Sequence, residues 1–408
     1  MREEHVLSCG VSRLTRRALL GRFAALGTAG LAGCTGLGRQ GSEYTETDPR
    51  ETARPVTGES PPELRPFETA VLEYMNEHAI PGATLGVAKD GTVLLERGYG
   101  YRDADRSRAM EPETLFRTAS LSKAFTRAAI RTLVRTGELS LQEPAFSRLA
   151  LDPLPGESYN DRLDEITIRQ LLDHRGGWDR DRTRDPLFSQ LDIALERGWT
   201  EPPSRRQLVR YMLSEPLQFD PGTEVAYSNI GYSVLGQLIE AVTDTPYQQY
   251  LDRELFEPHG IDDIALGRSL PADRPDRETW YFDEMACRNT VDVAPLELVR
   301  CPDGGFHLEA TDASGGHVAT VGAMLAFMRE YWLDGHPRDD GQHAGTFTGT
   351  LPGTFTIAMQ DRRGVDVVLA FNQRGYEPNY LDVREKLQDA IGAVEAWHGD
   401  EAGTYGSP

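Results

Sequence analysis

The chain has 408 residues, of which 39% are hydrophobic and 8% aromatic, and this supplies enough apolar side chain for a globular core of one or two domains. Its formal net charge of −21 argues against nucleic acid and anionic membrane surfaces as partners, because both would repel it. Only three of its 43 basic residues are lysine. An acidic, lysine-poor surface predicts adaptation to high salt, where salt screens the repulsion between carboxylates; the alternative is an ordinary soluble protein encoded by a GC-rich genome.

Residues 1–33 are predicted to be a targeting segment. Twin arginines, Arg16 and Arg17, precede two leucines, and the small-residue and apolar stretch from Phe23 to Gly33 is too short to span a membrane. This arrangement resembles a twin-arginine export signal. The segment ends in Leu-Ala-Gly-Cys34, which resembles the lipobox of exported lipoproteins. That resemblance implies cleavage before Cys34, a lipid on its sulfur, and an anchor at the outer face of the cell membrane; the alternative is an amphipathic N-terminus with an incidental cysteine.

Residues 34–62 are rich in Gly, Ser, Thr, Glu and Pro and predict a flexible linker. The folded domain is therefore expected over residues 63–398, followed by a tail at 399–408. Apolar residues at helical spacing predict an amphipathic helix from Phe67 to Ile80. Two β-rich runs between Ala83 and Tyr99 flank an Asp-Gly turn and predict a hairpin.

The stretch FRTASLSKAFT, residues 116–126, contains the first candidate for chemistry. Ser120 and Lys123 are three residues apart at the start of an apolar helical pattern, so their side chains lie one turn apart on one face. A lysine so placed can accept the serine proton and make the hydroxyl a nucleophile. The N-terminus of the helix also favours developing negative charge. The alternative is a helix-capping serine with a surface lysine.

The rest of the chain is helical in pattern from residue 166 to about 330 and returns to strand character near the C-terminus. The runs 346–359 and 365–372 flank a turn at Asp361 to Gly364 and predict a second hairpin, and a helix is expected over 381–397. Strands at both ends with helices between them predict an α+β fold, in which N- and C-terminal segments form one antiparallel sheet with a helical subdomain inserted.

Two of the four cysteines, Cys287 and Cys301, would remain in an exported and processed protein. In an oxidising compartment they could close a loop of about 15 residues as a disulfide; the alternative is two buried thiols. The chain has no C-x-x-C or H-x-x-x-H spacing, so we predict no metal site.

Two further motifs could supply partners for Ser120. Tyr227-Ser228-Asn229 follows an Asp-Pro-Gly turn; its tyrosine can act as a base, and its asparagine can hold the lysine and the substrate carbonyl. Tyr74 begins a second Tyr-x-Asn, but inside an amphipathic helix, where packing is expected. His343-Ala344-Gly345 heads a predicted strand and could contact substrate. His174 begins the same His-x-Gly pattern, and the strand that follows His343 favours His343.

These motifs, together with ITIRQLLDHRGGW at 166–178, DPGTEVAYSNIGYSVLGQLIE at 220–240 and HAGTFTGTLPGT at 343–354, resemble the β-lactamase-related serine hydrolases. That family includes class C β-lactamases, family VIII carboxylesterases and D-stereospecific peptidases. The resemblance covers about residues 65–395. It implies a β-lactamase/DD-peptidase-like fold and acyl transfer from an ester or amide without a cofactor.

The same resemblance implies a role for each site residue. Ser120 would form the acyl-enzyme, Lys123 and Tyr227 would share the acid/base work, and Asn229 would orient the lysine. Backbone amides of Ser120 and Thr346 would hold the oxyanion, with His343 and Gly345 beside the substrate. His343 would stand where penicillin-recognising enzymes carry the lysine of K-T-G, which argues against β-lactam turnover. His317 follows Ser314-Gly315-Gly316 at a position where relatives often carry an apolar or aromatic residue.

The leading hypothesis is an exported, lipid-anchored carboxylesterase that acts on small esters or amides. A β-lactamase or D-stereospecific peptidase is the alternative within the enzymes, and a non-catalytic binding or scaffold protein is the alternative outside them. The presence of Ser120, Lys123, Tyr227 and Asn229 together argues against a protein without turnover. The sequence leaves the natural substrate and the oligomeric state open.

Overall fold

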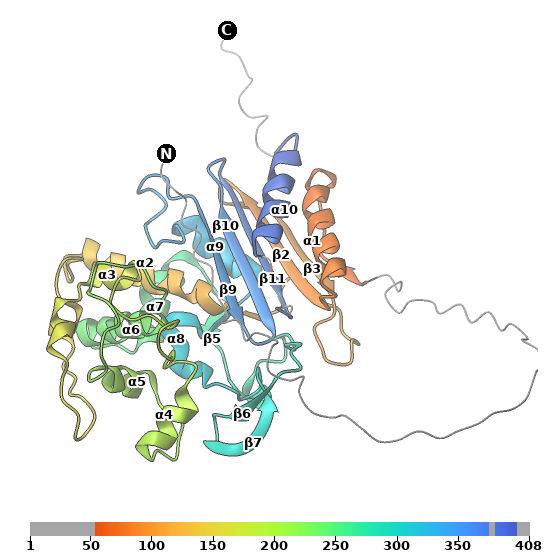
Figure 1. The fold of residues 1–408 in the computed structure, drawn as a ribbon. Helices are drawn as coiled ribbons and strands as arrows, with labels where there is room; N and C mark the ends of the chain where they lie inside the picture. The colour runs from red at the N-terminus through yellow and green to blue at the C-terminus, as the bar shows by residue number, and fades with distance from the viewer. Residues whose placement is uncertain (1–53, 375–379, 398–408) are drawn as a thin grey trace, which may run out of the picture. The chain divides into compact units, whose positions relative to one another are not determined.

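The computed structural model describes residues 54–374 and 380–397 (Figure 1). The predicted export signal, the lipobox with Cys34 and the C-terminal tail lie outside the described residues. The predicted linker is described only from residue 54 onward. There Val56–Thr57 forms strand β1 and pairs with Tyr99 and Gly98 of β3, so the ordered sheet begins before the expected start at residue 63.

A six-stranded antiparallel sheet joins the two ends of the folded chain. Its strand order is β1-β3-β2-β11-β10-β9. The bounds are β2 Gly82–Lys89, β3 Thr92–Gly100, β9 Gly345–Leu351, β10 Thr354–Gln360 and β11 Val365–Phe371. The N-terminal hairpin meets the C-terminal strands where β2 pairs with β11. This confirms the predicted α+β fold with a sheet built from both ends of the domain.

The predicted single run 346–359 is two strands. A turn at Pro352-Gly353 separates β9 from β10, and Gly353 has φ 75°, a conformation that glycine adopts without steric cost. β9 is an edge strand of the sheet. Its free edge can therefore approach another part of the molecule.

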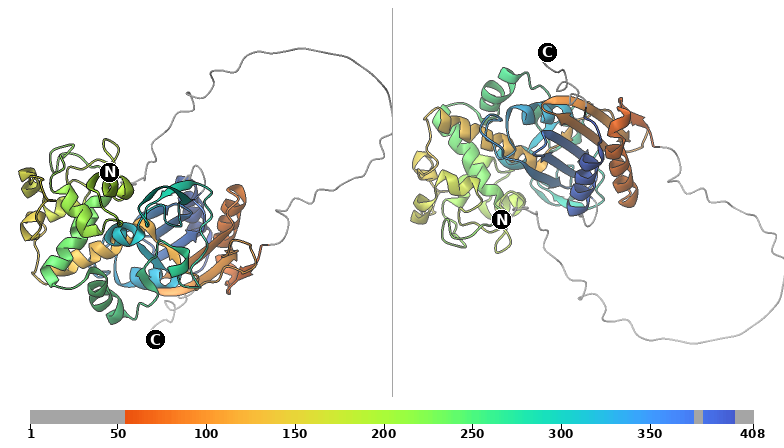
Figure 2. Two further views of the ribbon diagram at one scale, coloured as in Figure 1. Left: turned by 90° about the horizontal axis from the view of Figure 1, so that it is seen from below. Right: turned by 90° about the horizontal axis from the view of Figure 1, so that it is seen from above.

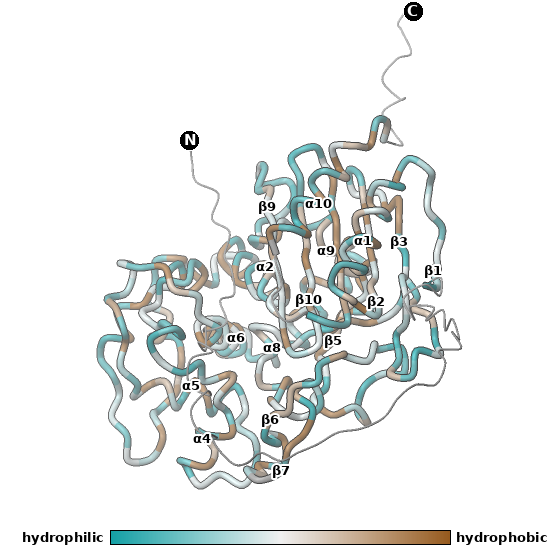
Figure 3. Tube along the Cα trace, turned by 45° about the vertical axis from the view of Figure 1, so that its right-hand side comes forward, coloured by the Kyte–Doolittle hydropathy of each residue, from teal (hydrophilic) through white to brown (hydrophobic). Residues whose placement is uncertain are grey.

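Helices cover both faces of the sheet. α1 (Arg65–Glu77) and α10 (Tyr380–Ala393) lie side by side on one face (Figures 1 and 2). They enclose a core with the odd-numbered residues of β2, β10 and β11. α9 (Val321–Glu330) packs on the other face, where a Cβ on Gly86 would come within 2.8 Å of Leu325. Hydrophobic residues accordingly follow the central strands and the helices that face them (Figure 3).

The helical subdomain forms around α6 (Asn229–Thr243), whose residues are all buried from Asn229 to Ile239. Such a helix belongs inside a core rather than at a surface. The helices that pack on it are α2 (Ser122–Arg135), α3 (Ile168–Leu172), α5 (Arg205–Met212), α7 (Tyr247–Leu251) and α8 (Asp312–Gly315), and α4 (Gln190–Arg197) belongs to the same subdomain. Among the described residues, no helix combines the length and the apolar character needed to cross a membrane.

Two small sheets also form, and four of their five strands lie in the segment predicted as helical. Strands β4 (Phe116–Arg117), β8 (His317–Ala319) and β5 (Ile264–Leu266) form one, and β6 (Ala286–Asn289) with β7 (Ala294–Arg300) forms the other. Apart from β7 these strands have two to four residues, and periodicity alone detects such short strands poorly. The β4–β8 pair leads directly into the segment that carries Ser120.

Candidate active site

Ser120 lies at the junction between β4 and α2. Ala119 immediately before it has φ 48°, a left-handed conformation that is unusual for a residue other than glycine. Ala119 to Leu121 form one 3-10 turn, and α2 follows at Ser122. The turn presents the half-buried Ser120 at the N-terminal end of the helix, where unpaired amides and the helix dipole favour a negative oxygen.

Lys123 is buried, with 3% of its surface exposed. Its Nζ lies 3.3 Å from Ser120 Oγ and donates to Asn229 Oδ1 at 2.8 Å and to the carbonyl oxygen of Ser314. The helix has no side-chain N-cap. The alternative of a capping serine beside a surface lysine is therefore wrong for this stretch.

Tyr227 completes the contacts of the serine, because its hydroxyl donates to Ser120 Oγ at 2.7 Å. Lys123 Nζ lies 5.0 Å from the centre of the Tyr227 ring and 5.4 Å from that of Tyr232, a separation that permits cation–π attraction. The structure thus brings together all four residues that the motifs suggested: Ser120, Lys123, Tyr227 and Asn229.

His174 supports Tyr227 from behind. The two rings stack with centroids 4.6 Å apart, and His174 Nδ1 accepts the backbone N–H of Ser228 at 3.2 Å. Complete burial, reinforced by the nearby charges of Arg127 and Lys123, holds the pKa of His174 well below its usual value. The imidazole is therefore neutral. Sequence reasoning ranked this His-x-Gly copy below His343, and the structure reverses that order.

Asp185 was not singled out from the sequence. Its Oδ2 accepts from Asn229 Nδ2 at 2.7 Å, and its Oδ1 accepts the backbone N–H of Leu187 at 3.0 Å. Burial raises the pKa of the Asp185 carboxyl, whereas these two hydrogen bonds act in the opposite direction. The residue lies in a segment without periodicity or motif, so the sequence offered no signal for it.

The strand beside Ser120 meets it at a different register from the one predicted. A Cβ on Gly349 would lie 2.4 Å from the carbonyl oxygen of Thr118 and 2.9 Å from the amide nitrogen of Ser120. Gly345 lies four residues earlier on β9, roughly 13 Å away at about 3.3 Å per residue. Thr346 pairs with Met359, near the far end of the β9–β10 ladder.

The predicted placement of His343, Gly345 and Thr346 beside the nucleophile is therefore wrong by four residues. The segment that takes their place is Phe347-Thr348-Gly349, followed by Thr350. The backbone amides of Ser120 and Thr350 become the candidate oxyanion donors. The Pro352-Gly353 turn that closes β9 marked this end of the strand in the sequence.

His343 instead joins a cluster with Asp334 and His336. Its Nδ1 lies 2.9 Å from Asp334 Oδ2, and its ring stacks on His336 at 4.2 Å with planes 16° apart. The three residues offer ligand atoms within 4.8 Å of one another and could hold a metal ion, as could Glu77, His78 and Asp382. The parallel rings do not aim their lone pairs at one point, so a metal would require one ring to turn.

His317 does not face the site. It is fully buried against Phe125, with ring centroids 5.1 Å apart, and its Nε2 lies 3.0 Å from Gln248 Oε1. Burial lowers the pKa of His317 to about 3. This position is part of the core.

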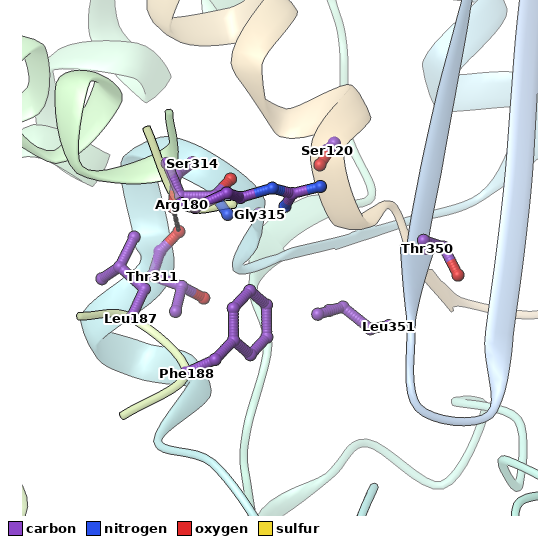
Figure 4. A pocket seen from close by; sticks show the side chains of 10 residues that line it. Ser120, Arg180, Leu187, Phe188, Thr311, Ser314, Gly315, Thr350 and Leu351 are labelled. Atoms are coloured by element: carbon purple, nitrogen blue, oxygen red, sulfur yellow. Dashed lines mark hydrogen bonds between the residues drawn. The ribbon is translucent and has the colours of Figure 1, made fainter. Parts of the chain in front are cut away.

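An open pocket lies in front of Ser120 (Figure 4). Its apolar lining comes from Leu187, Phe188 and Leu351, and Thr350 faces it from β9. Arg180 adds a positive charge, with its guanidinium 4.7 Å from the centre of the Tyr227 ring. The pocket can therefore hold a small, largely apolar group beside one cation.

Cys287 and Cys301 form a disulfide across the β6–β7 hairpin. Gly305 packs against it, because a Cβ there would lie 2.6 Å from Cys287 Cβ. The bond tethers a hairpin away from Ser120 and has no part in the pocket lining.

The sequence is similar to known proteins over the domain that contains this site. The family model described as Beta-lactamase matches residues 67–393. Protein flp of Staphylococcus aureus (strain MW2) is 31% identical over 192 residues, which cover 47% of this chain and 36% of that protein. The N-acetylmuramyl-L-alanine amidase of Bacillus subtilis (strain 168) is 29% identical over 187 residues, which cover 44% and 41%. The matched part thus spans well under two thirds of these relatives.

Solved structures share the fold. D-amino acid amidase from Ochrobactrum anthropi SV3 has a TM-score of 0.62 at 19% identity, covering 81% of this chain and 98% of the amidase. EstCE1, a hydrolase with promiscuous acyltransferase activity, has a TM-score of 0.58 at 19% identity with the same coverage. A penicillin-binding protein homologue from Pyrococcus abyssi has a TM-score of 0.59 at 20% identity, covering 80% of this chain and 76% of the homologue.

Proposed function

Because the chain belongs to the beta-lactamase family of serine hydrolases, we propose that it is a carboxylesterase that cleaves small esters through an acyl-enzyme on Ser120. One observation carries the proposal. Ser120 Oγ lies within reach of both Tyr227 OH, at 2.7 Å, and Lys123 Nζ, at 3.3 Å, at the edge of an open pocket.

The residues divide the reaction into two steps. Ser120 Oγ attacks the ester carbonyl while its proton passes to Tyr227 in its phenolate form, beside the Lys123 ammonium, or to Lys123 in its neutral amine form, and the oxyanion lies between the amides of Ser120 and Thr350. The acid that received the proton returns it to the departing alcohol. Water then attacks the acyl-enzyme through the same groups, releasing the carboxylic acid and regenerating the serine.

The lining of the pocket favours esters over β-lactams. Phe347 occupies the strand position at which penicillin-recognising relatives carry the lysine of K-T-G, and its ring lies 4.9 Å from the guanidinium carbon of Arg127. The remaining wall is apolar through Leu187, Phe188 and Leu351. An apolar acyl group fits such a wall, whereas a drug carboxylate gains nothing from Phe347.

Arg180 favours a second candidate, a D-stereospecific peptidase or β-lactamase. Its guanidinium could bind a substrate carboxylate in place of the strand lysine, since arginine pairs with carboxylates through two parallel hydrogen bonds. This candidate requires turnover of a substrate that carries such a carboxylate close to the scissile bond.

Parallel assays of p-nitrophenyl butyrate, nitrocefin and a D-Ala-D-Ala peptide in molar KCl test the two candidates. A carboxylesterase gives burst release of p-nitrophenol and leaves the other two substrates intact. Turnover of nitrocefin or the peptide alone would replace the esterase proposal by the second candidate. Absence of Ser120 acylation by every substrate and by a fluorophosphonate probe would leave a binding or scaffold protein.

For localisation, we propose an exported protein held at the outer face of the membrane by a lipid on Cys34. The support is the twin-arginine pattern and the lipobox-like sequence that ends at this cysteine. Mass spectrometry of the mature N-terminus checks the proposal. An unprocessed Met1, or a mature chain without lipid, would contradict it.

A further inference from the structure

We propose that Asp185 is a positioning residue that fixes the side-chain amide of Asn229 and, through it, the lysine beside the nucleophile. The inference rests on the proposed acyl-enzyme function of Ser120. Three contacts carry it in sequence: Asp185 Oδ2 to Asn229 Nδ2 at 2.7 Å, Asn229 Oδ1 to Lys123 Nζ at 2.8 Å, and Lys123 Nζ to Ser120 Oγ at 3.3 Å.

The chemistry of an amide explains why Asn229 needs such a partner. Its side chain has an acceptor oxygen and a donor NH2 of nearly the same shape, and either could face the lysine. Both oxygens of the Asp185 carboxyl group accept N–H donors, so Asp185 selects the NH2 group of Asn229. The amide oxygen is then directed at Lys123, whose ammonium group only donates.

Because Asn229 and Lys123 are buried, a wrongly oriented Asn229 amide is expected to lower the reaction rate. Asn229 is buried at 6% exposure and Lys123 at 3%, so water has little access to replace a missing partner. An amide turned the other way would place its NH2 against the ammonium group. The lysine would move away from Asn229, and a displacement of about 1 Å at a reacting group can cost on the order of 100-fold in rate.

A purely local role for Asp185 leaves its contact with Asn229 unexplained. Its Oδ1 accepts the N–H of Leu187, and its backbone oxygen accepts the N–H of Phe188 at 3.1 Å, which together shape a turn. The turn does not require the second carboxylate oxygen, which reaches Asn229 from 44 residues away in the sequence. The Asp185 carboxylate therefore connects the segment that contains Leu187 and Phe188, which line the pocket, to Asn229, which holds Lys123.

Three substitutions separate the two roles. Asp185→Asn has one acceptor oxygen in place of two, so it can accept from Asn229 only when its NH2 group faces the Leu187 N–H, and we expect a loss smaller than that of Asp185→Ala. Asp185→Ala removes both contacts, and Asp185→Ser keeps a short acceptor for the turn but cannot reach Asn229. We expect both to lower the rate of Ser120 labelling by a fluorophosphonate probe, and kcat/KM for p-nitrophenyl butyrate, by about 10- to 100-fold.

The matched control is Asp192→Ala in the following helix. Asp192 is a half-buried aspartate whose Oδ1 pairs with Arg288 rather than with Asn229. We expect wild-type labelling and turnover from this variant. Circular dichroism and the thermal midpoint of each variant show whether it is folded, and Asp185→Ser serves as the measured variant if Asp185→Ala is not.

A double-mutant cycle with Asn229→Ala decides between positioning and general damage. If Asp185 acts through Asn229, Asp185→Ser adds less than about a two-fold loss in the Asn229→Ala background. Multiplying losses, or a folded Asp185→Ser with wild-type labelling, would overturn the inference. Absence of labelling in the wild-type chain would instead reject the proposed function, so the two failures remain distinguishable.

Discussion

Gly349→Ala tests the register that brings β9 against the nucleophile. The added Cβ would lie 2.4 Å from the Thr118 carbonyl oxygen and 2.9 Å from the Ser120 amide nitrogen, both backbone atoms. These groups must separate by about 1 Å to reach van der Waals contact. The amides of Ser120 and Thr350 would then no longer converge on one oxyanion. Losing one such donor costs about 10²- to 10³-fold in kcat, and the overpacking itself costs about 1–3 kcal/mol of stability.

The assay is burst kinetics with p-nitrophenyl butyrate, together with the labelling rate of Ser120 and the thermal midpoint. Gly345→Ala is the matched control, because its Cβ would have no neighbour closer than 3.8 Å. We expect this variant to keep wild-type kinetics, while Gly349→Ala remains folded and loses activity. The opposite result, a damaged Gly345→Ala beside an active Gly349→Ala, would refute the register and restore Thr346 as the oxyanion donor.

Four further predictions concern the base, the disulfide, a buried histidine and the net charge. Lys123→Ala should lower the acylation rate of Ser120, measured by intact-protein mass, by about 10²- to 10⁴-fold; near-normal acylation would mean that another group is the base. Cys301→Ser should lower the free energy of unfolding by roughly 3 kcal/mol, because the disulfide to Cys287 closes a loop of about 15 residues, and an unchanged denaturation midpoint would contradict this. His317 has a folded-state pKa of about 3 against an ordinary 6.5, so it stabilises the protein fully above pH 6.5 and loses that contribution as pH falls toward 3. His317→Gln should therefore flatten the acid side of the stability curve by roughly 1.4 kcal/mol per pH unit, and a parallel curve would exclude His317 as the cause. The net charge of −21 predicts a higher unfolding temperature in molar KCl than in dilute buffer, and equal values would remove the case for salt adaptation.

The sequence predicted Ser120 and Lys123 because their arrangement depends on local geometry, whereas Tyr227 and Asn229 were predicted from the resemblance of their motif to that of the β-lactamase-related serine hydrolases. Three residues of helix set Ser120 beside Lys123, and this relation holds wherever the helix packs. The position of Asn229, the first residue of α6, likewise follows from the turn and capping serine that precede it. The antiparallel sheet was predictable for a similar reason, since two hairpin turns fix which strands are neighbours.

The register of β9 was not predictable in that way. A strand repeats every two residues, so sliding it by four restores the same face and leaves the pattern of the sequence unchanged. His343 and Phe347 are four residues apart, so the strand pattern alone fits either of them at the position of the K-T-G lysine. The close packing of Gly349 against Thr118 shows that Phe347 occupies it. The prediction was based on the His-x-Gly motif that ends at Gly345, whereas Gly349, four residues later, is the glycine that lies against Thr118 and Ser120.

Asp185 could not be predicted from the sequence because its partner lies far away along the chain. The proposed role of Asp185 depends on Asn229, which lies opposite its second carboxylate oxygen. No motif or periodicity within residues 179–189 predicts that contact. Lys123 is likewise fixed by Asn229 and Ser314, 106 and 191 residues away along the chain. The sequence can therefore identify the nucleophile from one turn of helix and Asn229 from a family motif, but Ser314 and Asp185 lie in segments without a motif and reach the lysine or its asparagine only in the complete fold. It follows that substitutions at these distant contacts should impair acylation while leaving the local Ser-x-x-Lys geometry of α2 intact.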